Sequence, residues 1–148
     1  MLKLGSIELS ERYSVPEGLY YTRDHEWVKL TGKRTALIGI TDYAQRKLRE
    51  IIYVELPQPQ TRVVQKQVIA TVESVKASVD IYAPLTGKLL EVNTKLADSP
   101  ELINDSPYDD GWLARFEIAD ESELQTLMEA DEYSRYIAEL EEEAGEEE

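Results

Sequence analysis

The sequence lacks cysteine altogether and contains a single histidine, His25, among 148 residues. Without cysteine the chain has neither a disulfide framework nor a thiolate metal cluster. One histidine cannot build a multi-histidine metal site, so we expect no metal, and His25 is the only candidate base for a histidine triad. No apolar run approaches the ~20 residues of a membrane span, and the start lacks the apolar stretch of a signal peptide. These absences predict a soluble, cytoplasmic protein without a membrane partner.

Basic residues are scarce at the C-terminal end. Residues 1–116 contain 16 acidic and 15 basic residues, whereas residues 117–148 contain 14 acidic residues and Arg135 as the only base. A near-neutral body with an acidic end does not attract phosphate backbones, which excludes nucleic acid as a partner. The last eight residues, 141–148, carry like charges and offer almost nothing apolar to bury, so they are predicted to form an acidic, disordered tail.

The length fits one domain with appendages. We expect an N-terminal extension over residues 1–14 and a β domain over residues 15–118. A helical segment over residues 119–140 should pack on that domain. Short apolar runs separated by close-set turns are typical of a mainly β barrel or sandwich, here with short peripheral helices. One of these helices should follow Thr41, which is a plausible N-cap, and another should span residues 98–104.

The segment from Glu73 to Pro84 is the most distinctive part of the chain. Valines and aromatic residues flank a small, polar centre, which predicts a β-hairpin with Lys76 at its tip. A tip lysine is accessible to a modifying enzyme, and a carrier lysine needs that display because the group it holds must visit other active sites. Glu73, three residues before Lys76, is close enough to help a modifying enzyme recognise the lysine. Gly87 lies eleven residues after Lys76, where the backbone must reverse.

The sequence resembles the lipoyl-bearing H protein of the glycine cleavage system over about residues 19–137. Any one matching block is weak, but the joint order and spacing of seven blocks is highly specific. These blocks are Tyr21-Thr-Arg-Asp-His-Glu-Trp27, Gly39-Ile-Thr-Asp-Tyr-Ala-Gln45, Tyr53-Val-Glu-Leu-Pro57, Glu73-Ser-Val-Lys-Ala77, Asp80-Ile-Tyr-Ala-Pro84, Asp98-Ser-Pro-Glu-Leu-Ile-Asn104 and Gly111-Trp-Leu113.

The resemblance implies a hybrid barrel-sandwich fold with lipoate in amide linkage to Lys76. It also implies a carrier without catalytic activity of its own, which shuttles an aminomethyl group and reducing equivalents. In the family the loaded arm swings into a cleft on its own domain, and the residues at the positions of Asp24, Glu26 and Asp80 would line that cleft. Carboxylates suit this task because the aminomethyl amine is cationic and would be held by charge-assisted hydrogen bonds.

The resemblance also implies a set of partners. A lipoate ligase or transferase would attach the arm. Glycine decarboxylase, which uses pyridoxal phosphate, a folate-dependent aminomethyltransferase and the flavoenzyme dihydrolipoyl dehydrogenase would then use it. The chain itself is expected to be a monomer, because no sustained apolar stripe is left unassigned.

Two departures from the family pattern leave the partner system open. The family usually has Gly-Asp where this chain has Arg49-Glu50, and a glycine where this chain has Gln60. Losing that glycine removes easy access to positive φ, so the turn over residues 57–60 is expected to run differently. The alternative is an H-protein-like lipoate-binding protein that carries sulfur intermediates for a sulfur-oxidation complex resembling heterodisulfide reductase.

The same residues allow other interpretations. An unmodified β domain that acts only as an interaction module is the third hypothesis. Biotin on Lys76 is disfavoured because the tip lysine of a biotinyl domain is typically flanked by methionines, and here the flanking residues are Val75 and Ala77. His25 is either a catalytic base or, as we favour, a residue that fixes the His-Glu-Trp segment against the barrel.

Overall fold

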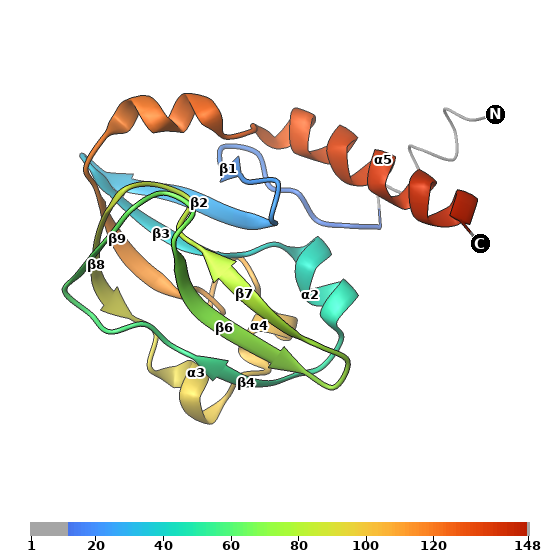
Figure 1. The fold of residues 1–148 in the computed structure, drawn as a ribbon, viewed down its shortest axis with the longest axis horizontal. Coiled ribbons are helices and arrows are strands. Elements are labelled where there is room, and N and C mark those ends of the chain that lie inside the picture. Colours follow the sequence, from blue (N-terminus) through green and yellow to red (C-terminus); the bar gives the residue numbers. More distant parts are fainter. Residues whose placement is uncertain (1–11, 148) are drawn as a thin grey trace.

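The protein folds into two antiparallel sheets, seen here in a computed structural model that describes residues 12–147 (Figure 1). Most of the expected N-terminal extension, residues 1–14, lies outside the described residues. The six-stranded sheet has the order β1 (Tyr20–Tyr21), β2 (Glu26–Gly32), β3 (Thr35–Ile40), β9 (Ala114–Ile118), β8 (Gly87–Val92) and β5 (Thr61–Val63). The three-stranded sheet has the order β4 (Ile51–Glu55), β6 (Val68–Ser74) and β7 (Ser78–Tyr82).

The main core lies between the two sheets. Strand β9 shows how the sequence builds it, since Ala114, Phe116 and Ile118 are buried while the residues between them are exposed, as the two-residue period of a strand requires. Val28, Ile38 and Leu89, with 0–1% of their surface exposed, complete this face of the six-stranded sheet. Side chains from the other sheet close the core, among them Ile51, Val54, Val72 and Ile81. The predicted mainly β class is therefore confirmed.

Short helices connect the strands at the periphery. Helix α2 (Asp42–Leu48) begins as predicted, with the Thr41 side chain accepting a hydrogen bond from the Ala44 backbone N–H at 3.2 Å. The single helix expected over residues 98–104 is wrong. The structure has two one-turn helices, α3 (Lys95–Asp98) and α4 (Leu102–Asp105), and the chain between them turns at Ser99 and Pro100.

The C-terminal segment is more ordered than its composition suggests. A 3-10 helix, η1 (Glu121–Thr126), is followed by the long helix α5 (Ala130–Glu147), which lies along one side of the molecule and extends past α2 (Figure 1). The disordered tail predicted over residues 141–148 is therefore wrong as far as Glu147. The physical reason is that Glu141 is anchored, because Lys47 forms an ion pair with it at 2.5 Å and the Tyr43 hydroxyl donates a hydrogen bond to it at 3.1 Å.

A second, largely aromatic cluster attaches α5 to the barrel. Tyr133 and Ile137 of α5 are fully buried, and the Tyr133 ring stacks on Tyr21 with the ring centroids 4.6 Å apart. The residue pair Tyr21 and Met128 exchanges two backbone hydrogen bonds of 2.8 Å, which ties the segment before α5 to strand β1. Within the described part of the chain, no helix is both long and apolar enough to cross a membrane.

Candidate functional site

Lys76 lies at the tip of the β6–β7 hairpin, as the sequence predicts. The last paired residues of the two strands are Glu73 and Ser78. Ser74 closes the turn, because its hydroxyl oxygen accepts hydrogen bonds from the backbone N–H groups of Lys76 at 3.1 Å and Ala77 at 3.0 Å. The turn is thus fixed by its own residues while Lys76 remains exposed. Ser74 was not among the predicted site residues, although a serine hydroxyl that bonds nearby backbone is typical of turns.

The hairpin tip rests on the connection between α2 and β4. The backbone N–H of Val75 donates to the Glu50 carbonyl oxygen at 3.0 Å, and Lys76 Nζ donates to the Lys47 carbonyl oxygen at 3.4 Å. Arg49 lies between these two residues in the chain, and its backbone adopts φ 67° and ψ −149°. This region of backbone space is adopted almost only by glycine, and it costs another residue about 1–3 kcal/mol.

Asn104 of α4 holds this strained connection in place. Its side-chain amide donates to the Arg49 carbonyl oxygen at 2.9 Å and to Gln45 Oε1 at 2.8 Å, while its Oδ1 accepts the Ile51 backbone N–H at 2.9 Å. One side chain therefore bonds to α2, to the residue that ends this helix and to the first residue of β4. Asn104 was part of a matching block, but the sequence alone assigned it no role.

The turn over residues 57–60 does not avoid positive φ, so the expectation that it runs differently without a glycine is wrong. Gln60 itself adopts φ 64°. Its backbone N–H donates to the Leu89 carbonyl oxygen at 2.6 Å, and its side-chain amide donates to the Leu90 carbonyl oxygen at 2.9 Å. Two hydrogen bonds to β8 offset the conformational cost that glycine would not incur.

A pocket of about 460 Å³, lined by three acidic and two basic residues, opens at the other end of strand β7 from Lys76. Three carboxylate residues, Asp24, Glu26 and Glu132, line it together with Tyr82 at the end of β7. The remaining walls come from the end of β1 and the turn after it, the loop before β6, the chain after β7 and the chain leading into α5. They include Tyr21, Thr22, Arg23, Gln65, Lys66, Ala83, Pro84, Thr126, Leu127 and Met128.

Glu26 is the most buried acid of this pocket, with 2% of its surface exposed. Its Oε1 accepts the Thr22 hydroxyl at 2.5 Å, and its Oε2 accepts the Tyr82 backbone N–H at 3.1 Å. Burial disfavours the charged form and raises the pKa of Glu26 to about 7, although both hydrogen bonds oppose that rise. At neutral pH this carboxyl is therefore poised between its neutral and charged forms.

The structure brings only two of the three predicted cleft acids to the pocket wall. Asp24 and Glu26 line the pocket, whereas Asp80 lies outside it on the exposed face of β7 and accepts the Thr71 hydroxyl at 3.4 Å. Asp80 lies two residues before Tyr82, so both side chains project from the same face of the strand. Asp80 is thus positioned between the hairpin tip and the pocket.

The two residues expected to support the hairpin are separated in space. Glu73 is exposed on β6 and pairs across the strand with Ser78, next to the tip. Gly87 is the first residue of β8 in the six-stranded sheet, where it pairs with Val63 and Ile118. A Cβ atom there would lie 1.9 Å from the Glu117 carbonyl oxygen. Gly87 is therefore required for close strand approach, and it does not form the hairpin turn.

His25 does not line the pocket and belongs to a partly buried polar network. Its Nδ1 lies 2.9 Å from the Tyr133 hydroxyl, which lies 2.7 Å from Thr41 Oγ1, the cap of α2. Burial lowers the pKa of His25 to about 4, so the imidazole is neutral at physiological pH. The geometry supports the interpretation of His25 as a packing residue that links β2, α2 and α5. No group of three possible metal ligands occurs among the residues that the structure describes.

Comparisons with known proteins agree on one family. The family model described as "Glycine cleavage H-protein" matches residues 19–140. A glycine cleavage system H protein from Halothermothrix orenii is 48% identical over 128 residues, which cover 86% of this chain and 99% of the relative. A probable glycine cleavage system H protein from Thermococcus gammatolerans is 47% identical over 135 residues, covering 90% of this chain and 99% of the relative.

A solved structure extends the similarity to the fold. The crystal structure of a glycine cleavage system H protein from Mycobacterium marinum superposes with a TM-score of 0.74 at 33% sequence identity, over 81% of this chain and 96% of that chain. This likeness confirms the lipoyl-domain-like barrel-sandwich predicted from the sequence. These relatives are named for glycine cleavage and give no support to the sulfur-oxidation alternative. The chain belongs to the glycine cleavage H-protein family, whose members are non-catalytic carriers with a covalently lipoylated lysine.

Proposed function

We propose that Lys76 is the lipoylated lysine, and that the chain carries an aminomethyl group and reducing equivalents between enzymes of the glycine cleavage system. The observation that carries the proposal is the display of Lys76. Its amine is exposed at a hydrogen-bonded hairpin tip, and the carbonyl of Lys47 at 3.4 Å is its one hydrogen-bond partner among the described residues. An amide at Nζ keeps one hydrogen, so this bond can persist after attachment.

The chemistry of the pocket suits a cationic cargo. Bound lipoate would supply a dithiolane that accepts the aminomethyl group and electrons. The chain's own contribution is to hold the amine of the cargo, and Glu26 is placed to do so because a nearby cation would favour its carboxylate form. Asp24 on the pocket wall adds a second acid. Inside this pocket a labile adduct would also be shielded from bulk water.

Asp80 has a different place in this proposal. It projects from the same face of β7 as Tyr82, and Tyr82 belongs to the pocket wall. We assign Asp80 to the path between the tip and the pocket, where its carboxylate would attract the positive cargo as the arm approaches. Glu73 remains the candidate for recognition by the attaching enzyme, because it is exposed beside the tip.

The proposal implies the partners of the glycine cleavage system. These are a lipoate ligase or transferase, glycine decarboxylase, an aminomethyltransferase and dihydrolipoyl dehydrogenase. A cytoplasmic location and a monomeric state remain predictions from the sequence.

Intact-mass analysis of the natively expressed protein tests the lysine assignment. We expect a mass increment of one lipoyl group that is lost in Lys76→Arg. The matched control is Lys33→Arg, because Lys33 also lies in a turn between two strands, and it should keep the increment. The lipoylated chain should then support glycine–bicarbonate exchange with purified glycine decarboxylase. An unmodified chain from lipoate-fed cells would overturn the attachment, and absent exchange with active partners would overturn the assigned system.

A further inference from the structure

The strained connection between α2 and β4 carries an arginine, Arg49. The Arg49 side chain is exposed, and within the described residues its guanidinium makes no hydrogen bond or ion pair. Asn104 holds the Arg49 carbonyl, so the neighbouring structure maintains a backbone conformation that glycine would adopt without cost. Strain that surrounding contacts maintain is typical of functional positions. A guanidinium is the obvious functional group that glycine could not provide.

Backbone contacts place the segment that contains Arg49 next to Lys76 and Val75. Lys47 and Glu50, on either side of Arg49, supply the carbonyl oxygens that bind Lys76 Nζ and the Val75 N–H. The β4–β6 pairing is irregular between Ile51 and Tyr53, so Ile52 and Tyr53 are both exposed, at 52% and 50%. β-bulges often redirect side chains next to functional sites. Val75 at the tip is 61% exposed.

The tip contacts the connection beneath it, and we call the exposed residues of these two segments the tip face: Arg49, Ile52, Tyr53, Val75 and Lys76. Around Lys76 its side chains are the apolar or aromatic groups of Ile52, Tyr53 and Val75 and the unpaired guanidinium of Arg49, and the exposed acids Glu50 and Glu73 border it. A guanidinium presents its N–H donors in a planar fork, which matches the paired oxygens of a carboxylate or a phosphate. A complementary partner therefore has an apolar contact surface and one anionic group opposite Arg49.

We infer that Arg49 is a specificity residue for the enzyme that attaches lipoate. Its guanidinium binds an anionic group that this enzyme brings to the tip face. This inference rests on the proposed lipoylation of Lys76. Attachment forms a bond from Lys76 Nζ to the lipoyl carbonyl carbon while the bond from that carbon to its leaving group breaks and the amine loses a proton. The attaching enzyme must therefore contact the tip itself, whereas later partners act at the far end of the arm.

The experiment measures lipoylation kinetics of the unmodified, full-length chain and its variants. The key variant, Arg49→Gly, removes the cation and relieves the strain. We expect it to raise the urea midpoint of unfolding and to lower kcat/KM for attachment about tenfold, mainly through KM, as loss of one charge-assisted hydrogen bond would. Arg49→Glu should be slower still, and Arg49→Lys should recover part of the rate. The difference from the unaltered chain should shrink at high ionic strength.

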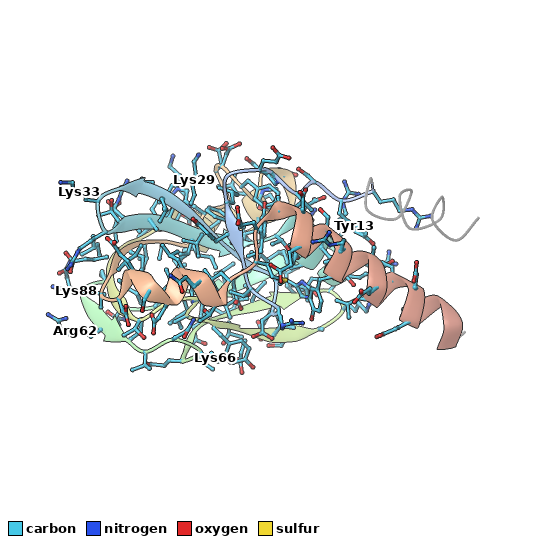
Figure 2. The ribbon with its side chains drawn as sticks, turned by 90° about the horizontal axis from the view of Figure 1, so that it is seen from above. Tyr13, Lys29, Lys33, Arg62, Lys66 and Lys88 are labelled. Atoms are coloured by element: carbon cyan, nitrogen blue, oxygen red, sulfur yellow. The ribbon has the colours of Figure 1, made fainter. Side chains whose placement is uncertain are left out.

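Two controls isolate the role of this cation. Gln60→Gly relieves positive φ in a turn that bonds to β8 and removes the side-chain hydrogen bond to Leu90, and it should leave attachment unchanged. Arg62→Ala removes an exposed arginine at the end of the barrel opposite the tip, and it should leave the attachment rate unchanged (Figures 1 and 2). A variant that merely loosened the tip would lower the midpoint instead of raising it.

Two enzymes distinguish the source of the anion. One is a lipoate–protein ligase supplied with lipoate and ATP, whose activated donor carries a phosphate. The other is a transferase that takes the acyl group from a thioester without a nucleotide. A defect with both enzymes indicates a carboxylate of the enzyme, and a defect with the ligase alone indicates the donor's phosphate.

Attachment to Arg49→Gly at the rate of the unaltered chain with both enzymes would overturn this inference alone. An unaltered chain that neither enzyme lipoylates would overturn the proposed function as well. The two failures are therefore distinguishable in one set of reactions.

Discussion

Glu26 of strand β2 and Tyr82 of strand β7 are joined by a hydrogen bond of 3.1 Å, in which the Tyr82 backbone N–H donates to Glu26 Oε2. The bond connects the six-stranded sheet to the hairpin that carries Lys76. It also orients a buried carboxyl at the pocket wall, where the other oxygen is held by the Thr22 hydroxyl. One side chain therefore serves both the packing of the two sheets and the charge of the pocket.

The buried Glu26 carboxyl predicts a pH-dependent stability. Its pKa is about 7 in the folded chain against an ordinary value of 4.5, so the folded chain binds this proton more tightly than the unfolded chain. The resulting stabilisation is complete below pH 4.5 and is lost as pH rises through 7. Relative to Glu26→Gln, the unfolding free energy of the unaltered chain should fall by up to about 3 kcal/mol across this window.

Urea unfolding at a series of pH values measures this difference. Glu55→Gln, which changes an exposed acid on β4, is the matched control and should leave the shape of the pH profile unchanged. Parallel profiles for Glu26→Gln and the unaltered chain would show that Glu26 titrates alike in both states, contrary to the prediction.

His25 should titrate far below an ordinary histidine. Burial lowers its pKa to about 4, and the charge of Asp24 opposes this shift only in part. Since it is the only histidine in the chain, its ring protons can be followed by NMR without assignment ambiguity. The stability linked to this group is present above the ordinary value of 6.5 and is lost as pH falls towards 4. A midpoint near 6.5 would contradict the buried network with Tyr133.

Local patterns in the sequence predicted the elements that depend on neighbouring residues. The hairpin around Lys76 follows from valines flanking a small polar centre, and the start of α2 follows from Thr41, whose hydroxyl caps the helix. The predictions that were wrong depend on contacts between distant residues. The order of the helix beyond Leu140 needs Lys47 and Tyr43, which lie about a hundred residues earlier.

For the candidate site too, the residues predicted correctly are those that depend on local sequence. The position of Lys76 was predicted from local sequence, and so was the nearby Glu73. The roles of Asn104 and Arg49 were not, because a strained connection held by one amide is a property of the folded backbone. Asp80 was expected at the pocket wall, but the wall is formed by segments from both ends of the chain, and no local pattern predicts how these segments meet.

Gly87 should tolerate no side chain. A Cβ atom there would lie 1.9 Å from the Glu117 carbonyl oxygen and 2.7 Å from the Phe116 ring, so β8 and β9 would have to separate. Gly87→Ala is expected to destabilise the fold by about 3 kcal/mol or more in urea unfolding. The same change at Gly145, in α5 with open space around it, should leave stability equal or slightly raised, because alanine favours helix. Equal effects at both positions would contradict the steric argument.

The C-terminal end of α5 should contribute to stability even though its sequence is almost entirely acidic. Figure 2 shows Tyr13 beside α5, and Tyr43 and Lys47 of α2 both contact Glu141. Burial alone would raise the pKa of Glu141, but its hydrogen bond and ion pair with Lys47 outweigh burial and lower it. Removing residues 141–148 should therefore cost about 1 kcal/mol of unfolding free energy, and Glu141→Gln should account for most of that loss.

A double-mutant cycle with Lys47→Met isolates the ion pair, because the Lys47 carbonyl that binds Lys76 is left intact. Glu143→Gln, which changes an exposed acid of the same helix, is the control for the loss of one negative charge. If truncation leaves the urea midpoint unchanged, the anchor at Glu141 has no energetic role and α5 is held by Tyr133 and Ile137 alone.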